Sequence, residues 1–291
     1  MNTAIGLVGL GLVGRALGAR LSAAGHAVLG WDRRDQANAD WAAAGGRVAP
    51  SLQALGAQCR AVVLAVFDTT GVLQVLEGGD GLLAGGTPLV LVDCSTGDPD
   101  ALQALAARLA ARGIDFIEAP LSGSSQLIGE GRATMLLGAA EGTLQRHAAL
   151  LQALSPQRLP VGGPGMGARA KLATNLVLGL NRAALAEGMV FAQALGIAPQ
   201  TFVELVLATP ARSDAALAKG AMMVDESFTP PQSRIVQHLK DLQLMLDQAR
   251  AAGQRLPLTE AHAALLRAAV DAGDGELDNA AILRQLRRET L

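Results

Sequence analysis

Short apolar runs alternate with longer stretches of helix-forming residues along the first 160 positions of the chain. This alternation is typical of an α/β domain, and a run such as Val-Leu-Val at 90–92 suits a strand that helices cover on both faces. The predicted strands are residues 4–8, 27–31, 47–49, 61–66, 89–92, 115–119, 134–137 and 158–160. Helices predicted between them include residues 15–24, 52–58, 70–76, 100–111 and 144–154, and the glycine-rich residues 77–86 are expected to be a surface connection.

The pattern changes after the Gly-Gly-Pro-Gly turn at residues 162–165. Residues 168–196 show no strand pattern and are compatible with one helix of about eight turns. The rest of the chain stays helical between prolines and glycines. We therefore predict one domain over residues 1–162, then a long connecting helix and an all-helical C-terminal domain over residues 163–291.

The first predicted strand runs directly into a G-x-G-x-x-G sequence made of Gly9, Leu10, Gly11, Leu12, Val13 and Gly14. In this pattern the first glycine allows a tight turn, the second lets backbone approach a pyrophosphate, and the third lets the helix pack on the strand. The helix N-terminus offers its N–H groups to the phosphates. The second strand ends at Asp32, where a carboxylate can meet the adenosine ribose hydroxyls. The N-terminal domain is therefore predicted to be a doubly wound Rossmann domain that binds NAD or NADP.

The residues after the second strand bear on the choice of cofactor. Asp32 favours NAD, because its carboxylate accepts from the 2′-hydroxyl and repels a 2′-phosphate. Arg33 and Arg34 favour NADP, since guanidinium groups bind phosphate. The repulsion by Asp32 would act at the contact itself, so NAD is favoured and NADP stays open.

The composition of the chain argues against several classes of function. A net charge of −2 over 291 residues gives no electrostatic argument for binding nucleic acid or an anionic membrane. The chain contains no apolar run near the ~18 residues of a membrane span, and its N-terminus lacks the basic region of a signal peptide. The two cysteines, Cys59 and Cys94, suit a reducing compartment. We expect a cytoplasmic protein, and we identify no metal site.

Two residues near the start of the connecting helix are candidates for chemistry. Lys171 and Asn175 lie four residues apart, so their side chains share one helix face. A lysine there can exchange a proton with a substrate oxygen while the amide orients that substrate. A solvated helix surface would show the same pair.

Strand-end loops supply further candidates. Ser122, Gly123 and Ser124 follow a predicted strand, and their N–H and hydroxyl groups would either bind a carboxylate or cap the next helix. The loop 93–99, which contains Thr96, allows the same two interpretations. Taken alone, the Lys240-Asp241 dipeptide indicates a surface charge pair.

Five motifs occur together in one order. They are the glycine fingerprint at 9–14, S-T-x-x-P at 95–99, P-L-S-G at 120–123, G-x-G-x-x-x-K-x-x-x-N at 165–175, and K-D at 240–241. In this order the chain resembles the β-hydroxyacid dehydrogenase family, which includes 3-hydroxyisobutyrate dehydrogenase, tartronate semialdehyde reductase and glyoxylate/succinic semialdehyde reductase. The resemblance spans nearly the whole chain. It implies hydride transfer between NAD(P) and a small β-hydroxy acid or aldehyde acid, with a small carboxylate as substrate.

The resemblance also implies roles for individual residues. Lys171 would be the catalytic general acid/base, and a buried position beside an oxidised nicotinamide would lower its pKa toward the useful range. The substrate carboxylate would be held by Ser122, Gly123, Ser124 and Asn175. On the cofactor side, Thr96 would contact the nicotinamide ribose region, and Val66 and Phe67 would border the adenosine-side phosphate and ribose. Lys240 would close over cofactor and substrate.

The chain also departs from the family pattern. Ser124 stands where many members have glycine, and the substrate loop with His238 is closer to the glyoxylate/succinic semialdehyde reductase branch. That branch usually carries Asn-Arg-Thr where this chain has Asp-Arg-Arg at 32–34, so its substrates and NADPH preference do not carry over. An imine reductase, or a non-catalytic NAD(P)-binding module, is the alternative, although such proteins mostly lack a lysine at position 171. The Ala- and Leu-rich helical half and the resemblance favour a homodimer or homotetramer.

Overall fold

The computed structural model describes residues 4–86 and 88–289, and the chain divides into two compact units, Met1–Lys171 and Leu172–Leu291. The division lies inside the long helix α10 (Met166–Ala194), whereas the sequence predicted it at residue 162. The reason is that the first turn of α10 packs with the sheet. Ala168 is buried in the core of unit 1, and its N–H donates to the Glu118 carboxylate.

Unit 1 is built on a nine-stranded sheet in the order β3-β2-β1-β4-β5-β6-β8-β7, with β9 paired to β8. Its strands are β1 (Ile5–Val8), β2 (Val28–Trp31), β3 (Arg47–Val48), β4 (Ala61–Leu64), β5 (Val90–Asp93), β6 (Asp115–Glu118), β7 (Leu121–Ser122), β8 (Thr134–Gly138) and β9 (Arg158–Gly162). The first six strands pair in parallel, and β8 is antiparallel to β6 and β7. The doubly wound Rossmann fold is thereby confirmed. Among the strands in the described residues, the two-residue β7 is the one that the sequence did not predict.

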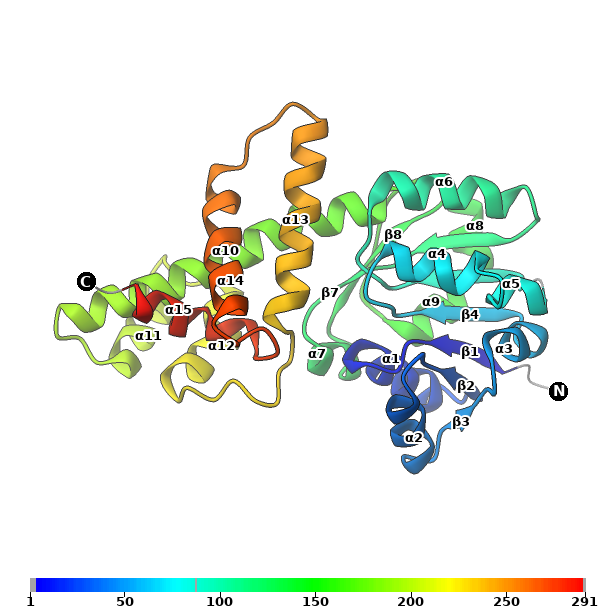
Figure 1. Ribbon diagram of the computed structural model, residues 1–291, viewed down its shortest axis with the longest axis horizontal. Coiled ribbons are helices and arrows are strands. Elements are labelled where there is room, and N and C mark those ends of the chain that lie inside the picture. The colour runs from blue at the N-terminus through cyan, green and yellow to red at the C-terminus, as the bar shows by residue number, and fades with distance from the viewer. Residues whose placement is uncertain (1–3, 87, 290–291) are drawn as a thin grey trace. The chain divides into compact units, whose positions relative to one another are not determined.

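Helices cover both faces of this sheet (Figure 1). One core takes apolar residues from α1 (Leu12–Ala23), α2 (Asp35–Ala43), α7 (Ser125–Gly129) and α9 (Ala148–Leu154). The other takes them from α3 (Leu52–Gln58), α4 (Thr69–Glu77), α5 (Leu82–Gly85) and α6 (Pro99–Ala110). Because side chains alternate along a strand, Leu7 lies in the first core and Val8 in the second.

Two local predictions in unit 1 are wrong. Residues 77–86 are not only a surface connection, because they contain α5, whose Leu82 is fully buried in the core. The helix predicted over 144–154 is two helices, α8 (Glu141–Arg146) and α9. They separate at His147, whose backbone is not helical and whose ring nitrogen Nε2 lies 2.7 Å from the Asp115 carboxylate.

Unit 2 is all-helical, as predicted. After α10 come α11 (Pro199–Ala208), α12 (Asp214–Val224), α13 (Ile235–Ala251), α14 (Pro257–Asp271), the short 3₁₀ helix η1 (Asn279–Ala281) and α15 (Ile282–Arg288). In unit 2 the buried positions of α10 are 172, 175, 179, 182, 185, 186, 189 and 192, a spacing that gives this part of the helix one core-facing stripe. Within residues 4–86 and 88–289, no helix combines the length and apolar content needed to cross a membrane.

Candidate functional site

The glycine loop between β1 and α1 has the shape of a pyrophosphate cradle. Gly9 has φ +94°, and a Cβ there would lie 2.3 Å from the Ala65 carbonyl oxygen. A Cβ at Gly14 would lie 1.8 Å from the Gly9 carbonyl oxygen, so only glycine lets the helix start this close to the strand. Gly11 is different, because its Cβ would meet only the Arg34 guanidinium, at 3.9 Å. Gly9 and Gly14 are fixed by close backbone, while the space over Gly11 suits a phosphate group.

The first turn of α1 supplies donors for that space. Helix α1 begins after Gly11, and in the described part of the chain no side chain caps it. The N–H groups of Leu12, Val13 and Gly14 lie in this first turn, where a helix leaves amides without intrahelical partners. The Leu10 N–H is used within the protein, because it donates to Asp32 Oδ2 at 2.8 Å. The Leu10 side chain is fully buried.

Asp32 lies buried just after the end of β2, and its carboxylate accepts several hydrogen bonds. Its carboxylate accepts from the Arg34 side chain through Nε and Nη2, both at 3.0 Å, and from the Arg34 N–H at 2.9 Å. Burial acts to raise the pKa of Asp32, but the hydrogen bonds from Arg34 and Leu10 hold it below its ordinary value. Arg33 and Arg34 are both exposed, and the Arg34 side chain folds back on Asp32 and lies beside Gly11. The ribose end of the cradle therefore presents an ionised carboxylate with a guanidinium against it.

The loops after β4 and β5 are joined to each other. The Val66 N–H donates to Ser95 Oγ at 3.1 Å, and the Ser95 N–H donates to Asp93 Oδ1 at 2.9 Å. Phe67 is half-exposed and Thr96 half-buried in these loops. Strands β1, β4 and β5 are adjacent and parallel, so these loops share one sheet edge with the glycine loop.

The loop after β6 contains the predicted carboxylate-binding residues. Ser122 is in β7, opposite Thr134 of β8. Gly123 has φ +148°, and a Cβ there would lie 2.9 Å from the Ala133 Cβ, so the turn requires glycine. Ser124 is the N-cap of α7, and its Oγ accepts from the Leu127 N–H at 3.3 Å. The capping interpretation thus holds for the Ser124 hydroxyl.

Lys171 and Asn175 are both buried, with 7% and 8% of their surface exposed. They lie one turn apart on one face of α10, so the interpretation of this pair as a solvated surface is wrong. Charged and amide side chains are rarely buried unless they are partnered or functional.

In unit 2, Asn175 belongs to a polar network with α13. Its Nδ2 donates to Asp241 Oδ2 at 3.1 Å, and Lys240 Nζ pairs with Asp241 Oδ1 at 3.0 Å. The side chains of Lys240 and Asp241 are 18% and 12% exposed, so this dipeptide is not a surface charge pair. Asp241 received no role from the sequence. The K-D motif was the available signal, but nothing in the sequence pairs it with Asn175, 66 positions earlier.

Known proteins resemble both halves of the chain. The sequence profile described as "NAD binding domain of 6-phosphogluconate dehydrogenase" matches residues 4–163. The profile described as "NAD-binding of NADP-dependent 3-hydroxyisobutyrate dehydrogenase" matches residues 165–286. Together these two profiles cover nearly all of the chain.

Individual relatives match over almost their full length. An L-threonate dehydrogenase of Escherichia coli O6:H1 is 31% identical over 96% of this chain and 93% of its own. A 2-(hydroxymethyl)glutarate dehydrogenase of Eubacterium barkeri is 28% identical over the same shares. The crystal structure of a 3-hydroxyisobutyrate dehydrogenase from Salmonella typhimurium superposes with a TM-score of 0.87, at 28% identity over 97% of this chain and 99% of that one. A solved imine reductase from Pseudomonas sp. is more distant, at 22% identity and a TM-score of 0.64, and shares the fold.

Proposed function

The chain belongs to the β-hydroxyacid dehydrogenase family, and on that basis we propose that Lys171 is the general acid/base of its reaction. Its relatives in this family are named dehydrogenases of small hydroxy acids. The two sequence profiles that match the chain are both described as NAD-binding. This chain is therefore an NAD(P)-dependent oxidoreductase acting on a small hydroxy acid or its carbonyl counterpart. The observation that carries the role of Lys171 is its burial on the same helix face as Asn175.

Each of these residues has a separate role in the proposed reaction. When bound, NAD(P) supplies or accepts the hydride. As an ammonium group, Lys171 donates a proton to the substrate oxygen during reduction, and as an amine it accepts that proton during oxidation. Asn175 orients the substrate, and Asp241 fixes the side chain of Asn175 by accepting from its Nδ2. In unit 1, Ser122, Gly123 and the backbone of Ser124 bind the substrate carboxylate. In unit 2, Lys240 contacts substrate and cofactor.

For the cofactor, we propose that Leu12, Val13 and Gly14 donate to the pyrophosphate. Val66 and Phe67 border the adenosine-side phosphate and ribose, and Thr96 contacts the nicotinamide ribose region. NAD is the favoured form. The carboxylate of Asp32 at the end of β2 would accept from a 2′-hydroxyl and would repel a 2′-phosphate, and Arg34 is already hydrogen-bonded to that carboxylate. Arg33 is exposed, and its guanidinium is the group that would favour NADP.

A nicotinamide absorbance assay tests the function. The oxidative arm pairs 3-hydroxyisobutyrate, glycerate, threonate and serine with NAD and with NADP. The reductive arm pairs glyoxylate, succinic semialdehyde and tartronate semialdehyde with the reduced cofactors. Turnover of one of these acids is the expected result. An additional arm offers cyclic imines, and activity there without activity on any acid would favour imine reduction. Cofactor binding without turnover in any arm would favour a non-catalytic module.

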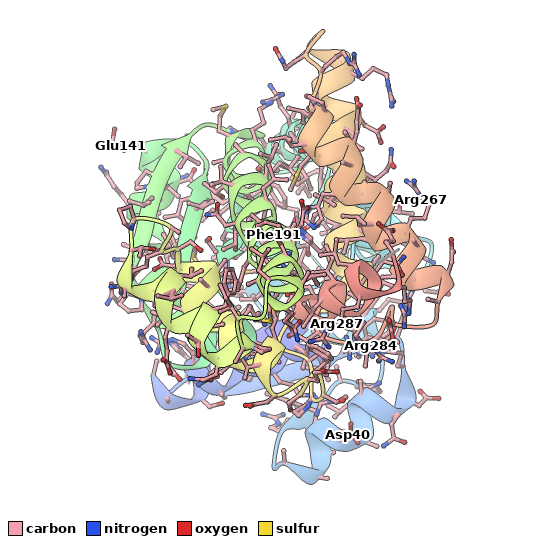
Figure 2. The ribbon with its side chains drawn as sticks, turned by 90° about the vertical axis from the view of Figure 1, so that its left-hand side faces the viewer. Asp40, Glu141, Phe191, Arg267, Arg284 and Arg287 are labelled. Carbon is pink, nitrogen blue, oxygen red and sulfur yellow. The ribbon has the colours of Figure 1, made fainter. Side chains whose placement is uncertain are left out.

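We also propose that the protein assembles into a homodimer or homotetramer through unit 2. Phe191 on α10 is 64% exposed, Leu195, the residue after the end of that helix, is 63% exposed, and Leu205 on α11 is 49% exposed (Figure 2 labels Phe191). Exposed apolar groups of this size favour burial against another copy of the chain. Light scattering after size-exclusion chromatography is expected to show an oligomer that Phe191→Glu dissociates. A monomeric wild-type protein would contradict this assembly.

A further inference from the structure

Glu118, the last residue of β6, holds the beginning of the helix that carries Lys171. Only 1% of its surface is exposed. Its carboxylate accepts a hydrogen bond from the Gly165 N–H and another from the Ala168 N–H, the latter at 2.9 Å. These amides belong to the N-terminal end of α10, where a helix has donors without intrahelical partners and where its dipole favours a negative charge.

Two glycines allow the helix end to approach the sheet this closely. Gly138 of β8 lies opposite Glu118 in the strand register. A Cβ at Gly138 would lie 2.5 Å from the Gly167 nitrogen, and a Cβ at Gly167 would lie 2.9 Å from the Glu118 Cβ. The first turn of α10 is therefore in direct contact with β6 and β8, and the Glu118 carboxylate is the polar group that fixes it there.

Lys171 follows Ala168 by three residues, which places it on the next turn of the same helix. Any tilt or withdrawal of the first turn would carry the Lys171 amine with it. We infer that Glu118 is a positioning residue, which anchors the first turn of α10 and thereby sets the position of the Lys171 amine against the strand-end loops of unit 1. This inference rests on the proposed role of Lys171.

The charge on Glu118 changes close to neutral pH. Burial raises the pKa of Glu118 to about 7, against the opposing effect of the hydrogen bonds from Gly165 and Ala168. The other charged groups that act on it are Asp93 at the end of β5, which raises this pKa, and Arg169 on α10, which lowers it. An ionised carboxylate accepts backbone N–H bonds more strongly than a neutral acid. The hydrogen bonds from Gly165 and Ala168 to Glu118 are therefore stronger above neutral pH than below it.

The test compares Glu118→Gln with Asp115→Asn in the turnover assay. Glutamine keeps the size of the side chain but offers one acceptor oxygen for two N–H groups. Asp115 is a carboxylate on the same strand, at the end remote from α10, where it binds Arg146 and His147. For Glu118→Gln we expect kcat to fall about 10-fold or more, KM for the cofactor to stay within about twofold, and the ionisation near pH 7 to vanish from the kcat profile. Asp115→Asn is expected to keep kcat and the profile of the wild type.

Two further variants keep the inference testable if Glu118→Gln does not fold. Glu118→Asp retains a titrating carboxylate and is expected to restore the ionisation near neutral pH. Gly138→Ala leaves Glu118 in place but displaces the Gly167 nitrogen, and it is expected to lower kcat as Glu118→Gln does. A Glu118→Gln variant with the kcat and the pH profile of the wild type would overturn the inference. If only Gly138→Ala folds, a wild-type kcat in that variant would overturn it. Lys171→Ala, run alongside, separates this result from failure of the proposed function, because an active Lys171→Ala overturns the role of Lys171 itself.

Discussion

The side-chain amide of Asn175 is hydrogen-bonded to the carboxylate of Asp241, with 3.1 Å between Nδ2 and Oδ2. The second oxygen of the same carboxylate pairs with Lys240 at 3.0 Å. One buried acid thus connects two residues for which the sequence predicted contact with substrate. Because Asp241 accepts from the amide nitrogen, it determines which way the Asn175 amide is turned.

Replacing this carboxylate by an amide removes its charge and leaves one acceptor oxygen for the two partners, Asn175 and Lys240, so use of the substrate should be impaired. In Asp241→Asn we expect kcat/KM for the acid substrate to fall about 10- to 100-fold, the range for loss of a hydrogen bond to a charged group. Asp247→Asn is the matched control, because Asp247 lies on the same helix in a largely exposed pair with Arg250. Steady-state kinetics check both variants. Equal kcat/KM values in Asp241→Asn and in the control would show that Asp241 does not position Asn175 for the substrate.

The glycines of the cradle should respond differently to alanine. Gly11→Ala is expected to fold with wild-type stability, because its Cβ has open space in the protein, but to lose about 10-fold or more in cofactor affinity. Gly14→Ala places a Cβ 1.8 Å from the Gly9 carbonyl and is expected to be destabilised as well. Thermal unfolding and calorimetric titration with NAD separate the two effects. Undiminished affinity in Gly11→Ala would mean that the pyrophosphate does not lie over this glycine.

Asp32 should control the choice between the two nicotinamide cofactors. The wild type is expected to have the higher kcat/KM with NAD, and Asp32→Ala is expected to lower the NAD-to-NADP ratio about 10-fold or more, because the repulsion of a 2′-phosphate is removed and Arg34 is released. Asp40→Asn, in an exposed pair with Arg15, serves as the control. A strong NADP preference in the wild type would contradict the assignment.

His262 should make the stability of unit 2 depend on pH. Burial and the neighbouring Arg182 guanidinium lower the pKa of His262 to about 4. The unfolded chain binds the proton at a higher pH than the folded one, so stability is greatest above about pH 6.5 and falls as the pH drops toward 4, by about 3 kcal/mol in all. His238, whose ring centroid lies 5.2 Å away, is the other titratable group facing this ring.

Denaturant unfolding at a series of pH values measures this dependence. His262→Phe keeps a ring of similar shape without a titrating nitrogen and is expected to flatten the curve between pH 4 and 6.5. An identical slope in His262→Phe and the wild type would show that another group is responsible.

The sequence predicted the parts of this molecule whose signals are local. The glycine fingerprint, the strand before it and the helix after it are consecutive in the chain, so their chemistry could be read directly. Helix α5 was missed because residues 78–86, which contain it, include five glycines, and only tertiary packing shows that Leu82 is buried. Glu118 and Asp241 were missed as well. Their partners lie 47 to 66 positions away along the chain, and no periodicity links a strand end to a particular helix turn.

The turnover of Lys171→Ala on the acid that the wild type uses tests the role of Lys171 most directly. The variant is expected to bind cofactor as the wild type does and to lose at least about 10²-fold in kcat, because the group that exchanges a proton with the substrate oxygen is gone. A kcat near that of the wild type would show that Lys171 is not the general acid/base.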